Sequence, residues 1–216
     1  MDGLQRQKRR LVTAIDYYEE QREIMSINKS TLPLTHAATS QLLIVNAQER
    51  LTKAMPEQDL QNMVPNVIQL SKAASLLDVP ITLSEHYGKG LGNTLSEITE
   101  HLPPHTKAKD KLTFSCCTAP GFEEELAEHG SRKQIVMVGL EAHICILQTA
   151  AGLQQWGYQV FVVEDAIASR KAINRENAIM RMRRGGVNIT NMESVIFEWM
   201  GDASHPKFKE ISQLIR

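Results

Sequence analysis

The chain has 216 residues, of which 24 are Lys or Arg and 25 are Asp or Glu, so its formal net charge at pH 7 is -1. This balance argues against a nucleic-acid partner held by bulk charge. No apolar run approaches the roughly 18 residues of a membrane span, and no signal-peptide pattern is present. The three cysteines, two of them adjacent (Cys116 and Cys117), do not make the framework of a secreted disulfide-rich protein. We therefore expect a cytoplasmic protein with no membrane partner.

Residues 1–40 are predicted to form an N-terminal extension. The charged stretch Gln5–Ile24 carries apolar residues at helical spacing, which predicts an amphipathic helix, and the Ser-, Thr- and Pro-rich stretch Asn28–Ser40 is typical of a linker. The basic run Arg6–Arg10 leaves nucleic-acid binding open as a weaker alternative. We favour a solvated helix face or an arm that packs on a neighbouring subunit, and with it a homo-oligomer.

Residues 41–216 are predicted to form one α/β domain, because apolar runs of strand length alternate with segments of helical period. The strands are expected at Leu42–Val45, Ile81–Ser84, Gln134–Val138, Gln159–Val163 and, as a short edge strand, Val187–Ile189. The main helices are expected at Gln58–Leu77, Gly121–His129, Ile144–Gln155 and Ile173–Arg184, with a short helix near Ser96 and two at the C-terminus. This alternation predicts a three-layer, doubly wound, mostly parallel sheet of the Rossmann-like kind, with its active site at the carboxyl ends of the strands.

The segment around Cys145 is the most informative part of the chain. An apolar run ends in Val138-Gly-Leu-Glu-Ala-His-Ile-Cys145 and leads into a helical pattern, so it is predicted to be a strand, a sharp loop and a helix. Near the first turn of that helix, backbone N–H groups and the helix dipole favour a thiolate. Cys145 is therefore a candidate nucleophile, although a small buried hydrophobic residue explains the same position equally well.

Two further positions bear on that nucleophile. The first predicted strand ends in Asn46, where an Asp could take a proton from a thiol but an amide has no usable basicity. Lys111 is a cation that could lower the pKa of a nearby thiol.

Three motifs together resemble the isochorismatase-like cysteine hydrolase superfamily. They are Asn46-Ala-Gln-Glu-Arg-Leu51, Lys111-Leu-Thr-Phe-Ser115 and Gly139-Leu-Glu-Ala-His-Ile-Cys145, and the resemblance runs in order from about Gln41 to the end of the chain. The superfamily carries an acid–base Asp at the position of Asn46, so this chain departs from the pattern there.

The resemblance implies a mechanism in which the Cys145 thiolate attacks the carbonyl of a small amide and forms a thioester that water hydrolyses. It implies that Lys111 holds the thiolate anionic and that the residue at position 46 shuttles a proton to the leaving amine. It also implies a cis peptide bond between Leu140 and Glu141, which would turn the N–H groups of Glu141 and Cys145 toward one point as an oxyanion hole. No cofactor is implied.

The substrate pocket is expected to include Glu85, His86, Tyr87, Phe114 and His143. Glu85 could replace the missing carboxylate, but a loop carboxylate that binds local N–H groups is the simpler interpretation. We expect no metal site, because the histidines near the first two strands lack ligand spacing.

Two functions remain open at this stage. The chain is either a cysteine hydrolase of a small-molecule amide or ester, impaired or retuned by Asn46, or an inactive relative that binds a metabolite or serves as an oligomeric scaffold. Retention of Cys145 and Lys111 favours the hydrolase.

Overall fold

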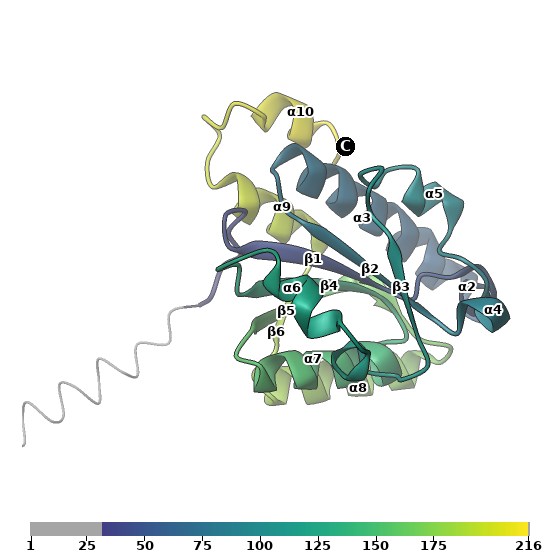
Figure 1. Ribbon diagram of the computed structural model, residues 1–216. Coiled ribbons are helices and arrows are strands. Elements are labelled where there is room, and N and C mark those ends of the chain that lie inside the picture. Colours follow the sequence, from purple (N-terminus) through teal and green to yellow (C-terminus); the bar gives the residue numbers. More distant parts are fainter. Residues whose placement is uncertain (1–31, 216) are drawn as a thin grey trace, which may run out of the picture. The chain divides into compact units, whose positions relative to one another are not determined.

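The computed structural model describes residues 32–215 (Figure 1). The predicted N-terminal helix, and with it the argument for an arm on a neighbouring subunit, lies outside these residues. In the described part of the chain, no helix has the length and apolar character needed to cross a membrane.

Among residues 32–215 the sheet has six strands in the order β3-β2-β1-β4-β5-β6, and every neighbouring pair is parallel. The strands are β1 (Ser40–Val45), β2 (Ile81–His86), β3 (Ala108–Lys111), β4 (Gln134–Leu140), β5 (Gln159–Ala168) and β6 (Asn188–Thr190). The order reverses between β1 and β4, and a crevice for ligands forms at such a switch point, outside the carboxyl ends of the strands. The prediction of a doubly wound parallel sheet is confirmed.

Helices cover both faces of this sheet (Figure 1). The longer ones are α3 (Glu57–Leu76), α7 (Leu147–Gln155), α8 (Ala172–Arg184) and α9 (Met192–Met200), and the shorter ones are α2 (Glu49–Thr52), α4 (Gly88–Leu91), α5 (Ser96–Thr99), α6 (Phe122–Ala127) and α10 (Phe208–Ser212). A 3-10 turn, η1 (Cys116–Thr118), and a π-helical turn, η2 (Ala142–Ile146), complete the elements. Figure 1 shows α3, α9 and α10 on one side and α6, α7 and α8 on the other.

Two hydrophobic clusters hold the layers together, one on each face of the sheet. Alternate residues of β1 divide between them: Leu42 and Ile44 pack toward α3 and α9, while Leu43 and Val45 pack toward α6, α7 and α8. All six residues of β1 and all seven of β4 are buried. Burial on both faces explains why the central strands are continuous apolar runs in the sequence.

Strand β3 was not predicted from the sequence. Its residues Ala108-Lys-Asp-Lys111 are mostly charged. It lies at the edge of the sheet and, in the part of the chain that the structure describes, pairs only with β2. An edge strand that faces solvent needs no apolar pattern, so periodicity gave no signal for it.

The compact unit begins at Leu34, before the predicted boundary between residues 40 and 41. The backbone N–H and the hydroxyl of Thr35 both donate to Glu198 Oε2, at 2.7 and 2.8 Å, and the His36 N–H donates to Gln134 Oε1 at 2.8 Å. The last residues of the predicted linker are therefore bound to α9 and β4.

Candidate active site

The predicted catalytic residues lie at the carboxyl ends of three strands, and therefore at the same end of the sheet. Asn46 follows β1, Lys111 ends β3, and the Leu140–Glu141 bond follows β4. Strand pairing sets Val45 beside Gly139, which brings the end of β1 next to the loop that leads to Cys145. A Cβ at Gly139 would lie 2.0 Å from the Val45 carbonyl oxygen, so only glycine permits this approach.

Asn46 is wholly buried and sits in the left-handed region, with φ 50°. Its N–H donates to the Ser84 carbonyl at 2.9 Å, and its Nδ2 donates to the Leu140 carbonyl at 3.3 Å. Besides glycine, Asn and Asp are the residues that tolerate this backbone conformation best. Asn46 can therefore adopt the same backbone conformation as the Asp that the superfamily carries at this position. Unlike that Asp, it has no charge.

Cys145 lies in the π-helical turn η2 and is 5% exposed. Burial raises the pKa of its thiol, whereas the Lys111 charge and hydrogen bonding from the Asn46 side chain and the Glu141 backbone act to lower the pKa. The balance lies above the ordinary thiol value, because loss of hydration outweighs one cation and these hydrogen bonds. The expectation that Lys111 and the helix start hold a thiolate stays a prediction.

Lys111 is itself 4% exposed, and backbone groups bind it. Its Nζ donates to the carbonyl oxygens of Thr113 at 2.9 Å and Phe114 at 3.0 Å. Within residues 32–215, no carboxylate forms a salt bridge with it. Its positive charge is therefore left to act on Cys145, and its ammonium group also orders the loop that follows β3.

A cis peptide bond joins Leu140 and Glu141, at the position that the resemblance implied. The Glu141 side chain is buried, and its Oε2 accepts from both the backbone N–H and the Nε of Arg170, each at 3.1 Å. The carboxylate of Glu141 thus anchors the loop before Cys145 to the end of β5.

The five predicted pocket residues divide into two groups. Glu85 Oε1 accepts from the backbone N–H of Thr94 at 2.6 Å and from its hydroxyl at 2.8 Å, which is the local role that we considered the simpler interpretation. His143 contacts Ser169 through Nδ1 at 3.0 Å and Asn174 through Nε2 at 3.3 Å. Both side chains therefore form hydrogen bonds with residues other than Cys145.

The remaining three pocket residues lie together where β2 and β3 end. The His86 and Phe114 rings are 5.5 Å apart, and burial, followed by the Lys111 charge, lowers the pKa of His86. The side chains of Tyr87 and Phe114 are about half exposed. The Tyr87 ring lies against Gly90 in α4, whereas the Phe114 carbonyl accepts from Lys111.

Two residues outside the predicted catalytic and pocket sets connect to this site. The Ser84 hydroxyl donates to Asn46 Oδ1 at 3.5 Å, and the Cys116 thiol lies 3.4 Å from the same Ser84 oxygen. Ser84 ended a predicted strand, which was a usable signal, whereas nothing in the sequence joined Cys116 to Asn46.

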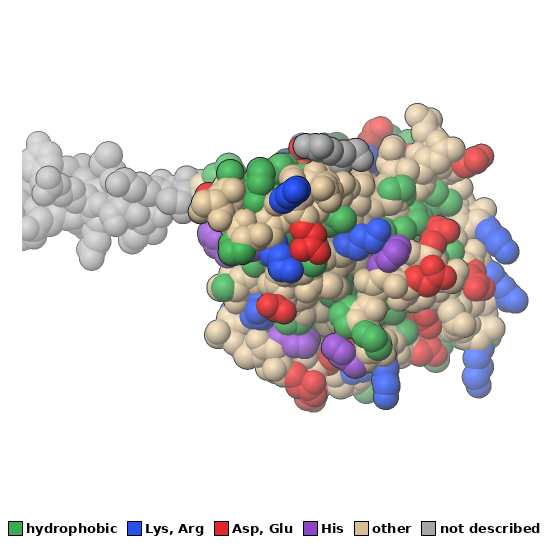
Figure 2. Space-filling model, turned by 90° about the horizontal axis from the view of Figure 1, so that it is seen from above, with side chains coloured by type: hydrophobic (Ala, Val, Ile, Leu, Met, Phe, Trp, Pro, Cys, Tyr) green, Lys and Arg blue, Asp and Glu red, His purple; other side chains and the backbone are tan. Residues whose placement is uncertain are grey.

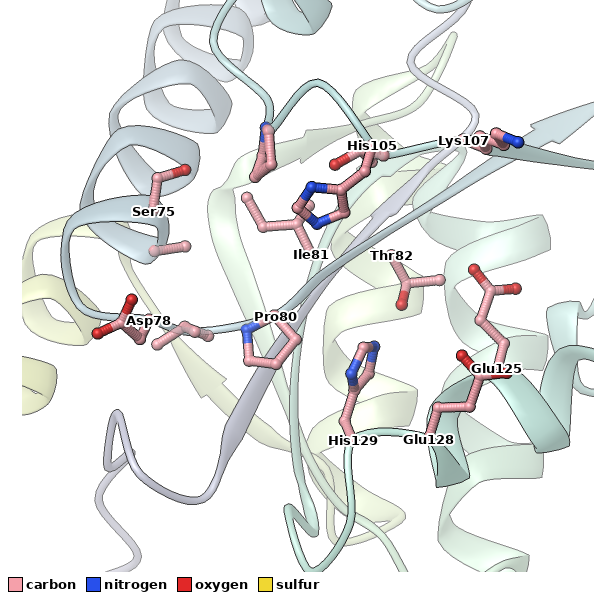
Figure 3. Close-up of a pocket in the computed structure, with 14 residues that line it drawn as sticks. Ser75, Asp78, Pro80, Ile81, Thr82, His105, Lys107, Glu125, Glu128 and His129 are labelled. Atoms are coloured by element: carbon pink, nitrogen blue, oxygen red, sulfur yellow. The ribbon is translucent and has the colours of Figure 1, made fainter.

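A cavity of about 520 Å³ lies elsewhere, at the amino ends of β2 and β3. Figure 3 shows His105 and His129 facing this cavity from two different segments, with Thr82 between them on β2. None of Asn46, Lys111 and Cys145 lines it. Across the described residues, no group of three or more His, Cys, Asp or Glu side chains is arranged to hold a metal ion.

Comparison with known proteins agrees with this geometry. The family model described as the isochorismatase domain matches residues 40–194. The secreted isochorismatase effector of Phytophthora sojae is 41% identical over 160 residues, covering 71% of this chain and 76% of that protein. Isochorismatase domain-containing protein 2 of Xenopus laevis is 37% identical over 181 residues, covering 82% of this chain and 83% of that protein. The structure of the MAR1 ribonuclease of Caenorhabditis elegans superposes with a TM-score of 0.79 at 33% identity, covering 85% of this chain and 92% of that one.

Proposed function

Because this chain belongs to the isochorismatase family, we propose that it is a cysteine hydrolase that acts on a small amide or ester through a thioester intermediate. The observation that carries the proposal is that Asn46, Lys111 and the loop before Cys145 lie at the same end of the sheet, after β1, β3 and β4, and each of them acts to lower the pKa of Cys145. A buried cysteine with a purely structural role needs none of these groups.

The proposed reaction begins when the Cys145 sulfur attacks the substrate carbonyl. A C–S bond forms, the carbonyl oxygen takes the negative charge, and the thiol proton passes to water. When the tetrahedral species collapses, the bond to the leaving group breaks and that group takes up a proton. Water then cleaves the thioester to give the acid and free Cys145.

Asn46 bears on the second of these steps. An amide nitrogen needs a proton in order to leave, and Asn46 cannot deliver one, a loss of about 10²–10⁴-fold if nothing replaces it. A thioester or an activated ester has a leaving group that needs little protonation. We therefore propose activated esters and thioesters ahead of simple amides, and vinyl-ether cleavage of the isochorismate type last.

The test is product release from matched amides, esters and thioesters of one small acid. Wild type, Asn46→Asp and Cys145→Ala are compared at equal concentration. We expect wild type to exceed Cys145→Ala on the activated esters, and Asn46→Asp to gain on the amides. Equal rates for wild type and Cys145→Ala on the whole panel would favour the alternative, an inactive protein that binds a metabolite or acts as a scaffold.

A second candidate function follows from the name of one relative. The Caenorhabditis elegans protein, at 33% identity, is named as a ribonuclease. Incubation of single-stranded RNA with wild type and Cys145→Ala tests this candidate. RNA cleavage breaks a P–O bond and involves no thioester, so cleavage by both proteins would identify an activity that does not need Cys145. Our expectations of a cytoplasmic location, a homo-oligomer and no nucleic-acid partner stay predictions.

On the face seen in Figure 2, side chains of both charges are interspersed, and we see no single basic patch among the described residues there.

A further inference from the structure

The orientation of the Asn46 amide follows from the chemistry of its neighbours. The Leu140 carbonyl oxygen, 3.3 Å away, can only accept a hydrogen bond, so the Asn46 atom that faces it is Nδ2. The Asn46 oxygen therefore faces the Ser84 hydroxyl, 3.5 Å away, and that hydroxyl donates.

Cys116 adds one more group to this series of hydrogen bonds. With its proton directed to Asn46, the Ser84 oxygen is free to accept, and the Cys116 thiol lies 3.4 Å from it. Cys116 is wholly buried, Ser84 is 1% exposed and Asn46 is 0% exposed, so water does not compete for these bonds. The chain of donors runs in one direction, from Cys116 through Ser84 to the Asn46 oxygen.

We propose that Ser84 and Cys116 are positioning residues that hold the Asn46 amide with its N–H side toward the Cys145 sulfur and its oxygen turned away. This inference rests on the proposed role of Cys145 as the nucleophile. An amide held this way donates to a thiolate. If it rotated by half a turn, its oxygen would face the anion and repel it.

The geometry gives the side chain at position 46 a role that needs no carboxylate, which is to donate a hydrogen bond that lowers the pKa of Cys145. The other titratable or charged groups that act on Cys145 are Lys111, from β3, and Cys116, from η1. Lys111 lowers the pKa of Cys145, and Cys116 would raise it if its own thiol were ionised. The hydrogen bond from Asn46 is thus one of the few contributions that favour the Cys145 thiolate. It depends on the hydroxyl of Ser84, 38 residues away on β2.

The test measures the rate of Cys145 alkylation by iodoacetamide between pH 6 and pH 11, read at each cysteine by mass spectrometry, and it needs no substrate. Ser84→Ala is expected to raise the apparent pKa of Cys145 by about one unit, so that alkylation at pH 7 slows by about tenfold. Ser84→Thr keeps the hydroxyl and should restore the wild-type profile.

Thr82→Val is the matched control. Thr82 lies two residues earlier on β2, is 2% exposed, and its hydroxyl is buried without a hydrogen-bond partner in the described structure. The substitution removes a buried hydroxyl from the same strand and should leave the profile of Cys145 unchanged.

A Ser84→Ala profile that superposes on wild type would overturn the proposal. If Ser84→Ala does not fold, Cys116→Ala decides: a raised pKa of Cys145 supports the chain of donors, and a lowered or unchanged one shows that Cys116 acts only as a neighbouring charge or not at all. Because alkylation does not depend on turnover, an inactive protein with the expected profiles would refute the proposed function and leave this inference standing.

Discussion

Nδ2 of Asn46 donates to the carbonyl oxygen of Leu140 and so ties the end of β1 to the end of β4, across 94 residues of sequence. The two strands are neighbours in the sheet, at the point where the strand order reverses. Position 46 carries an acid–base Asp in the superfamily. In this protein the side chain at that position also has a structural role.

Removal of this side chain should destabilise the fold. Asn46→Ala leaves the Leu140 carbonyl without its side-chain donor and the Ser84 hydroxyl proton without its acceptor, and alanine disfavours the left-handed backbone. We therefore expect a loss of about 2–3 kcal/mol in the free energy of unfolding. Urea denaturation measures it. Asn46→Gly keeps the backbone conformation and should lose less than Asn46→Ala. An Asn46→Ala protein as stable as wild type would contradict this interpretation of the contacts.

Lys111 should control the reactivity of Cys145. Its charge lowers the pKa of that thiol, so Lys111→Met is expected to raise the pKa further and slow alkylation of Cys145 at neutral pH by about tenfold or more. Site-resolved alkylation is the measurement. Lys109→Met, two residues away on β3, provides the control, because Lys109 pairs with Glu125 at 3.0 Å and does not act on Cys145. Equal slowing in the two variants would point to disruption of the edge strand instead.

Alkylation of Cys145, and any hydrolysis that depends on it, should increase steadily with pH. The thiolate is the reactive form, and burial places the pKa of Cys145 above the ordinary value, so the rate should rise about tenfold per pH unit and pass about pH 8.5 without a plateau. Cys117, whose pKa burial raises to about 12, should rise over a still more alkaline range. A plateau for Cys145 near pH 7 would show that its neighbours hold the thiolate after all.

Glu85 should not act as the missing general acid or base. Its Oε1 accepts both the N–H and the hydroxyl of Thr94, which commits the carboxylate to the loop after α4. Glu85→Gln is therefore expected to lower the melting temperature modestly and to leave the pH profile of hydrolysis unchanged. The profile is measured on whichever ester or amide wild type turns over. Loss of one limb of that profile in Glu85→Gln would assign Glu85 a role in proton transfer.

The sequence by itself determined the layers of the fold and the position of the candidate nucleophile. Buried strands such as β1 and β4 are apolar on both faces, and this local pattern is visible without a partner. The glycine before the Cys145 loop and the helical period after it likewise lie within one short segment. Local order of this kind depends mainly on neighbours in the chain.

Only the tertiary structure decided how the groups around Cys145 are connected. Strand β3 is charged and lies at an edge, so its place beside β2 follows from pairing rather than from its own pattern. The bonds from Ser84 to Asn46 and from Cys116 to Ser84 join segments 38 and 32 residues apart. The degree to which Cys145 is buried, and hence the balance that raises its pKa, is set by packing among these segments, and no local pattern in the sequence encodes it.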